Sequence, residues 1–277
     1  MRRRALVGPL TFTLIAFGVP WAGWFFVQNE ALSLWLFPLF ASIGGFSAAF
    51  AEGRTAGLIA FARRVFASVG AFRYVLVAAV IPVVLGFSYL FATGVPLSSV
   101  VLSTAAVLGL SLGAAFVTGP LAEEFGWRGY VQPALLRTLP PFWAALVVGL
   151  IWWVWHFALY RASVFAAPAS AFRFLAYLET WSIFAMFVVQ RARGSVWPSV
   201  ALHWAANTHP DILRVLLPSV DGGSLPGGSK GWLYYLAVAC AFAVVNRRFF
   251  FTKQAGVVAP RATANHSSKP TPLRSTA

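Results

Sequence analysis

Apolar runs of near membrane-spanning length recur from Ala5 to Phe251 and constrain the fold more than any other feature of the chain. About 20 apolar residues cross a bilayer as a helix, because every backbone polar group must find its partner inside the segment. Hydrophobic residues make up 59% of the 277 residues and charged residues 10%, whereas a soluble domain carries about 25% charged residues. The sequence therefore predicts an all-α, polytopic transmembrane helical bundle of about eight spans. We expect these at roughly 5–27, 31–51, 74–92, 98–121, 142–160, 174–190, 196–217 and 231–251.

The basic residues, which give a net charge of +14, indicate orientation rather than a nucleic-acid partner. With these spans, all basic residues except Arg161, Arg173, Arg214 and Lys230 fall on one side of the bilayer. The positive-inside rule makes that side cytoplasmic. No basic stripe is interleaved with exposed aromatics, which disfavours nucleic-acid binding. The sequence therefore predicts a multi-pass cell-membrane protein with both termini in the cytoplasm.

Two regions differ in composition. Residues 1–251 form the predicted membrane domain, and its first apolar stretch is treated as a retained span because no small-residue cleavage site closes it. Residues 252–277 are rich in Ser, Thr, Pro, Ala and basic residues without apolar periodicity, so we expect a disordered cytoplasmic tail. The single cysteine, Cys240, lies inside the last span and excludes a thiolate metal site or a disulfide framework.

Ionisable residues inside spans are costly, so they are candidates for function. The strongest cluster is Glu123-Glu124 with Arg128, after a Gly119-Pro120 pair that we expect to end or kink the fourth span. On a helix Glu124 and Arg128 share a face and predict an ion pair. Glu123 points about 100° away and is left without an obvious partner. Two interfacial acids that anchor a helix end would be the structural alternative.

Two further spans carry polar groups. His156 follows a Trp-rich run, and alone it would be interpreted as a structural histidine hydrogen-bonded near a helix end. His203 and Asn207 are four residues apart, so they share one helix face and supply donors suited to an oxyanion. Hydrogen bonding between helices is the alternative for this pair. One shared cavity below the cytoplasmic surface, containing Glu123 as well, explains all these residues together.

The order Glu-Glu-x-x-x-Arg, aromatic-x-x-x-His and His-x-x-x-Asn resembles the CPBP family of intramembrane proteases. That family comprises CAAX prenyl endopeptidases and bacteriocin-processing or Abi-type proteins. The resemblance covers about residues 116–210, and it departs from the family pattern at Trp152, where the family usually has Phe. It implies that Glu123 and His156 activate water. It further implies that His203 and Asn207 stabilise the oxyanion, with Glu124 and Arg128 as supporting residues.

The resemblance leaves the type of protease open. One glutamate and two histidines also form a ligand set of catalytic zinc sites, so Glu123, His156 and His203 are candidate metal ligands, and the expected cofactor is either none or zinc. The expected partners are the bilayer and a membrane-associated protein or peptide substrate. A catalytically inactive immunity or scaffold protein of the same family is one alternative function. A transporter is another, although we find neither the internal repeats nor the paired broken helices typical of transporters.

Overall fold

A computed structural model describes residues 6–27, 29–67, 71–95, 113, 115–216 and 231–253. This part of the chain is helical and contains no strand, which confirms the predicted all-α fold. In chain order the α-helices and the π-helical turns (η) are α2 (Val7–Thr13), η1 (Leu14–Gly18), α3 (Val19–Gly23), α4 (Glu30–Leu36), α5 (Leu39–Val65), α6 (Phe72–Ala92), η3 (Val117–Leu121), α8 (Ala122–Gly126), η4 (Trp127–Val131), α9 (Gln132–Leu136), α10 (Pro141–Trp155), α11 (Phe157–Tyr160), α12 (Pro168–Arg191), α13 (Trp197–Leu216), α14 (Gly231–Val245) and α15 (Arg247–Phe250).

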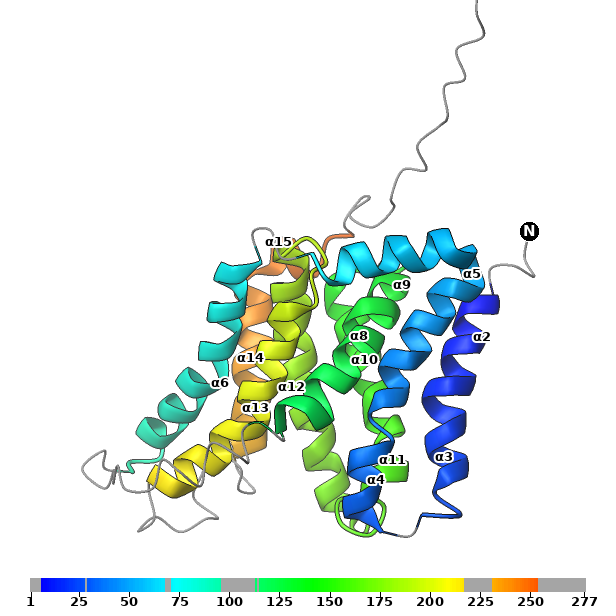
Figure 1. Cartoon of the computed structure of the whole chain (residues 1–277). Helices are drawn as coiled ribbons and strands as arrows, with labels where there is room; N and C mark the ends of the chain where they lie inside the picture. The colour runs from blue at the N-terminus through cyan, green and yellow to red at the C-terminus, as the bar shows by residue number, and fades with distance from the viewer. Residues whose placement is uncertain are drawn as a thin grey trace, which may run out of the picture.

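The helices form a bundle whose length and composition suit a membrane (Figure 1). Four helical stretches of the described chain are long and apolar enough to cross a bilayer, namely Ala31–Val65, Phe72–Ala92, Pro141–Tyr160 and Pro168–Arg191. Val7–Gly23 and Gly231–Val245 are apolar but shorter. The outer side of α6 exposes large apolar side chains such as Leu76, Val80 and Val84, which is the surface that a lipid-facing helix needs. Helices coincide with every expected span except 98–121, most of which lies outside the described residues.

A seam of small residues on α5 lets neighbouring backbones approach closely. A Cβ atom on Gly44 would lie 3.3 Å from the Ala16 side chain in η1, and one on Gly45 would lie 3.0 Å from the Phe125 carbonyl oxygen in α8. Small residues at helix contacts allow this tight packing in membranes. The seam therefore holds the helix that carries Glu123 and Glu124 directly against α5.

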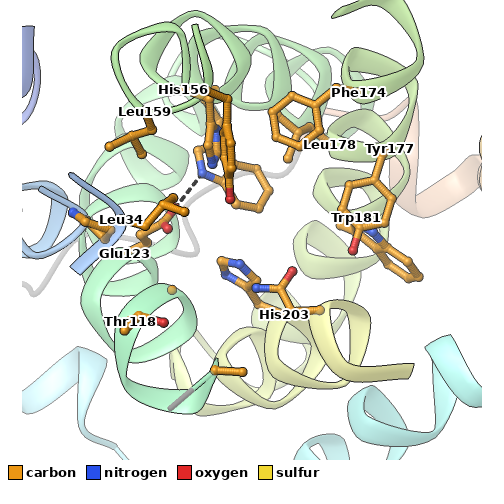
Figure 2. A pocket seen from close by; sticks show the side chains of 16 residues that line it. Leu34, Thr118, Glu123, His156, Leu159, Phe174, Tyr177, Leu178, Trp181 and His203 are labelled. Atoms are coloured by element: carbon orange, nitrogen blue, oxygen red, sulfur yellow. Dashed lines mark hydrogen bonds between the residues drawn. The ribbon is translucent and has the colours of Figure 1, made fainter. Parts of the chain in front are cut away.

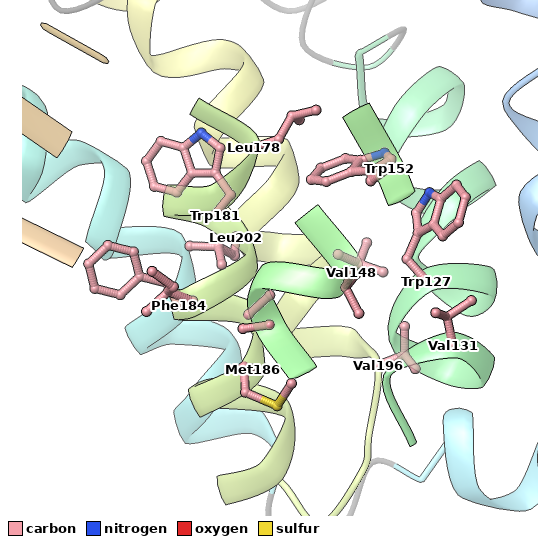
Figure 3. Packing of buried hydrophobic residues seen from close by; sticks show 14 of the residues in the cluster. Trp127, Val131, Val148, Trp152, Leu178, Trp181, Phe184, Met186, Val196 and Leu202 are labelled. Carbon is pink, nitrogen blue, oxygen red and sulfur yellow. The ribbon is translucent and has the colours of Figure 1, made fainter. Parts of the chain in front are cut away.

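Aromatic and aliphatic side chains fill the space between α10, α12, α13 and the helix that follows Val117 (Figure 3). The tryptophans Trp127, Trp152, Trp155 and Trp181 are all fully buried. Trp155 donates a hydrogen bond to the Ala16 carbonyl oxygen at 2.7 Å, which ties α10 to the N-terminal helix. A buried indole N–H needs such a partner, and the bond fixes the end of α10, next to His156.

Candidate active site

The two glutamates lie on a helix that passes through the bundle instead of ending at the Gly119-Pro120 pair. The helix does not end there, because Pro120 lies in the π-helical turn η3 and helical elements continue without a gap through α9. Residues 122–133 are all buried. Arg128, which the topology argument placed in a loop, is 1% exposed. Gly126 permits this depth, since a Cβ there would lie 2.6 Å from the Ala41 carbonyl carbon.

A cavity of about 170 Å³ brings the four predicted catalytic residues together. Glu123 comes from α8, His156 from the end of α10, and His203 and Asn207 from α13. Figure 2 shows Glu123 and His203 at two sides of an open space, with Phe174, Tyr177 and Trp181 of α12 along another side. The convergence accounts for the polar residues of three separate spans. Their catalytic roles remain predictions.

Glu123 is held by two indoles, so the expectation that it lacks a partner was wrong. Its Oε2 accepts hydrogen bonds from Trp152 Nε1 at 2.7 Å and from Trp127 Nε1 at 3.3 Å. Trp127 lies one helical turn further along, and Trp152 reaches across from α10. Within the described chain, Oε1 makes no hydrogen bond, and the residue lines the cavity. One oxygen is therefore anchored, and the other is available to a bound molecule.

His156 is oriented by its own helix. Its Nδ1 lies 2.8 Å from the Trp152 carbonyl oxygen. A carbonyl oxygen only accepts, so Nδ1 must carry the proton in this bond. In the neutral ring Nε2 is then a lone-pair acceptor, and the residue lines the cavity. The structure thus gives His156 a defined tautomer with its basic nitrogen unused by the described residues.

Glu124 joins the predicted ion pair to His203. Its Oε1 lies 3.0 Å from Arg128 and 2.9 Å from His203 Nδ1. Arg128 also donates to Ser182 Oγ at 3.3 Å, and its guanidinium lies 4.5 Å from the Trp152 ring centre. The predicted geometry of the pair is confirmed, and its contact with His203 shows what the pair supports. Arg128 fixes Glu124, and Glu124 orients the imidazole.

His203 and Asn207 face the same small space beside Gly119. A Cβ on Gly119 would lie 3.2 Å from Asn207 Nδ2 and 3.4 Å from His203 Nε2. Two nitrogens therefore converge on a point that glycine leaves open. This is the arrangement expected of donors that share one oxygen atom of a ligand.

The candidate metal ligands do not form a coordination group in this structure. Among the described residues, no three His, Cys, Asp or Glu side chains lie close enough to hold a metal ion. Glu123 and His203 each use one ligating atom on a neighbouring side chain, as given above. We therefore derive no catalytic step through a metal, and the cofactor stays a matter for experiment.

Three hydrogen-bonding residues of the site were not predicted to be partners of the motif residues. Trp127 and Trp152 bond Glu123, and Ser182 accepts from Arg128. Trp127 could have been found from its spacing of four from Glu123. Trp152 and Ser182 belong to other helices. Trp152 is the aromatic residue of the second motif, but neither segment indicates a hydrogen bond to the first motif.

Comparison with known protein families matches residues 104–209 to the Rce1-like type II CAAX prenyl endopeptidases. This range nearly coincides with residues 116–210, over which the three motifs carry the resemblance. The matched segment is similar to that family. It contains Glu123, His156, His203 and all elements from η3 to the first half of α13.

A curated relative supports the same assignment. CAAX prenyl protease 2 of Methanococcus maripaludis is 24% identical over 140 residues, which are 47% of this chain and 48% of the relative. The chain thus matches about half the length of that relative. The activity, the substrate and the mechanism of this chain therefore belong to the proposal below.

Proposed function

We propose that the chain is an intramembrane endopeptidase that hydrolyses a membrane-associated protein or peptide with a water molecule activated by Glu123 and His156. The observation that supports it is the single cavity in which Glu123, His156, His203 and Asn207 meet. The hydrogen bonds that fix each group leave Glu123 Oε1 and His156 Nε2 for the reaction. Each step below uses only groups of this chain.

In the proposed first step, Glu123 Oε1 takes a proton from water while the water oxygen attacks the peptide carbonyl carbon. His156 Nε2 accepts the other water proton as a hydrogen bond and so orients the nucleophile. The indoles of Trp127 and Trp152 keep the carboxylate in place. A base must lie within hydrogen-bond reach of the proton it removes, and the shared cavity provides this proximity.

The carbonyl oxygen becomes an oxyanion beside Gly119. Asn207 Nδ2 donates one hydrogen bond to it. His203 can donate a second one from Nε2 only as an imidazolium, because Nδ1–H is already directed to Glu124. The Glu124 carboxylate, whose Oε1 lies 2.9 Å from His203 Nδ1, would balance the charge of that imidazolium. The tetrahedral intermediate then collapses, the C–N bond breaks, and Glu123 returns its proton to the leaving amine.

The proposal is tested by comparing membrane peptides from cells that contain equal amounts of the wild type or of Glu123→Gln. New peptide termini that appear only with the wild type would identify substrates. Equal peptide profiles would instead favour the inactive immunity or scaffold alternative. Prenylated and unprenylated substrates are distinguished by the mass of the released carboxyl-terminal fragments.

Gly119→Ala should lower kcat by about 10², the cost of losing one oxyanion donor. The new methyl group would lie 3.2 Å from the Asn207 amide and 3.4 Å from His203, in the space proposed for the oxyanion. The backbone of Gly119 is not in the positive-φ region, so alanine should not strain it. Gly18→Ala, whose methyl group would meet nothing within 4 Å, is the matched control. Equal peptide-cleavage rates for both variants would contradict this position for the oxyanion.

Trp152→Phe should reduce kcat by about 10- to 100-fold, because a hydrogen bond to a charged group contributes about 1.5–3 kcal/mol. The substitution keeps a ring under Arg128 and removes the 2.7 Å bond to Glu123. Trp153→Phe is the control, since Trp153 bonds the Ala171 carbonyl oxygen and does not line the cavity. An unchanged cleavage rate would mean that Trp127 alone suffices to hold Glu123.

The orientation of the bundle affects substrate access. The cavity is lined by the end of α10, by α11, by Leu34 of α4 and by the first half of α12. In Figure 1, α4 and α11 lie at the end of the bundle opposite to α15 and to the start of α2. The sequence predicts both cytoplasmic termini and a cavity below the cytoplasmic surface. These two predictions conflict, because the cavity lies toward the end of the bundle opposite to α15 and the start of α2. With cytoplasmic termini, the cavity would lie nearer the outer leaflet.

We expect a reporter fused to the C-terminus to give a cytoplasmic signal, because the arginine clusters predict that side. In a Cys240→Ala background, Leu34→Cys should then react with a membrane-impermeant thiol reagent added outside intact cells. Leu76→Cys, on the lipid-facing side of α6, serves as an unreactive control. An extracytoplasmic signal from the C-terminal reporter would reverse the orientation and place the cavity near the cytoplasmic leaflet.

A further inference from the structure

A second cavity, of about 250 Å³, lies where α5 bends at one end of the bundle. The backbone leaves helical conformation at Arg54, with φ 55° and ψ −149°, and the rest of α5 lies across the bundle end (Figure 1). The bend brings Gly57 close to Ala49, so that a Cβ on Gly57 would lie 2.5 Å from the Ala49 carbonyl oxygen. Both sides of the bend, together with η4 and α9, line the cavity.

Two arginines face this cavity, and their charges are not balanced. Arg64 donates one hydrogen bond, to the Gly129 carbonyl oxygen at 2.6 Å, and a guanidinium has five N–H donors. The Arg137 side chain forms no hydrogen bond or ion pair with any described residue, although it lies close enough to repel Arg64. Glu52 is the one acidic residue among those that line the cavity, against these two arginines. The cavity therefore carries a net positive charge.

The Glu52 carboxylate, which lines the cavity, is hydrogen-bonded to a tyrosine and not to the arginines. Glu52 Oε1 accepts a hydrogen bond from Tyr130 at 2.7 Å. It is not within ion-pair distance of either arginine in the described structure. A ligand with negatively charged oxygens would supply the acceptors that the arginines lack, and a phosphate group offers several such oxygens to a guanidinium.

The surroundings of the cavity favour a lipid as the source of that phosphate. Phe50 and Ile59 on α5, and Phe66 directly after it, are exposed apolar side chains close in sequence to Arg54 and Arg63. A helix that combines exposed apolar and basic residues in this way lies at a membrane interface. Basic pockets between helices at this depth bind the headgroups of anionic lipids. This end of the bundle is also the one that the arginine clusters predict to be cytoplasmic, where such lipids are concentrated.

We propose that the cavity between the bend of α5 and α9 binds the phosphate group of an anionic phospholipid through Arg64 and Arg137. The site is separate from the candidate active site and does not depend on the proposed function. Free phosphate shares the same chemistry, and the experiment below distinguishes it from a lipid. Arg64 also contacts Gly129, the residue after Arg128, so the lipid would lie beside the helix that carries the glutamates.

The test is a titration of the full chain in detergent with dihexanoyl phosphatidylglycerol, read as the midpoint of thermal unfolding. We expect a saturable rise that dihexanoyl phosphatidylcholine and inorganic phosphate do not reproduce. Arg137→Gln should raise the apparent dissociation constant about fivefold. This factor corresponds to about 1 kcal/mol, the contribution of one basic residue near an anionic surface. The Arg137 side chain has no hydrogen bond or ion pair within the described chain to lose, so this variant should fold. Arg63→Gln, next to Arg64 on α5 and outside the cavity, is the matched control.

Four results would overturn the proposal. The first is a rise of the same size with phosphatidylcholine, which would indicate apolar binding alone. The second is an equal saturable rise with inorganic phosphate, which would assign the cavity to free phosphate. The third is equal weakening in Arg63→Gln and Arg137→Gln, which would indicate a diffuse surface charge. The fourth is the absence of any saturable rise.

Discussion

Glu123→Gln is expected to lower the rate of peptide cleavage by about 10²–10⁴, the usual cost of losing a general base. The amide is nearly isosteric with the carboxylate, and its oxygen can still accept the hydrogen bonds of Trp152 and Trp127. The amide nitrogen would replace Oε1 and cannot take a proton from water. The thermal unfolding midpoint in detergent should therefore stay close to that of the wild type while cleavage is lost.

The measurement is cleavage of a membrane peptide in proteoliposomes with equal amounts of reconstituted enzyme. Glu52→Gln is the matched control, because Glu52 also accepts a hydrogen bond from an aromatic residue but lies outside the active-site cavity. A Glu123→Gln rate close to wild type would exclude Glu123 as the base.

Chelator treatment of the wild type tests whether a metal ion takes part in catalysis. Activity that survives it favours glutamate-activated water, and activity restored only by added zinc favours a metalloprotease.

The sequence predicted the helical class and the residues of the site because both depend on local chemistry. Apolar runs fix the spans regardless of how they pack. Glu123, His156 and His203 could be singled out because ionisable groups are rare inside spans. The pair of Glu124 and Arg128 followed from helical spacing alone, and the 3.0 Å contact confirms it.

The contacts that position these residues could not be predicted, since they join helices distant in sequence. Trp152 reaches Glu123 over 29 residues, and His203 reaches Glu124 over 79 residues. The course of the backbone was also unpredictable at Pro120. A proline normally ends or kinks a helix, whereas here a π-helical turn absorbs it and the helix continues. The depth of the motif helix follows from Gly126 against Ala41, a contact that neither residue indicates alone.

Arg128→Ala is expected to destabilise the bundle by about 3–5 kcal/mol, because it leaves the buried Glu124 carboxylate without its guanidinium partner. Arg128 is 1% exposed and its other contacts, to Ser182 and to the Trp152 ring, would be lost as well. For a chain of this size the thermal midpoint should fall by on the order of 10 °C. Activity should fall too, since Glu124 would no longer be fixed where it orients His203.

Unfolding in detergent measures the stability, and Arg63→Ala, which replaces an exposed arginine outside the site, is the control.

A second variant separates the effect of Arg128 on stability from its effect on activity. In Arg128→Met with Glu124→Gln, no uncompensated charge remains, so a large part of the lost stability should return. Cleavage should stay low in that double variant, because a neutral amide cannot balance the charge of the His203 imidazolium that the proposed step requires. An Arg128→Ala thermal midpoint equal to that of the wild type would show that Glu124 is neutralised by other means. Recovery of activity in the double variant would show that His203 does not need the charge of Glu124.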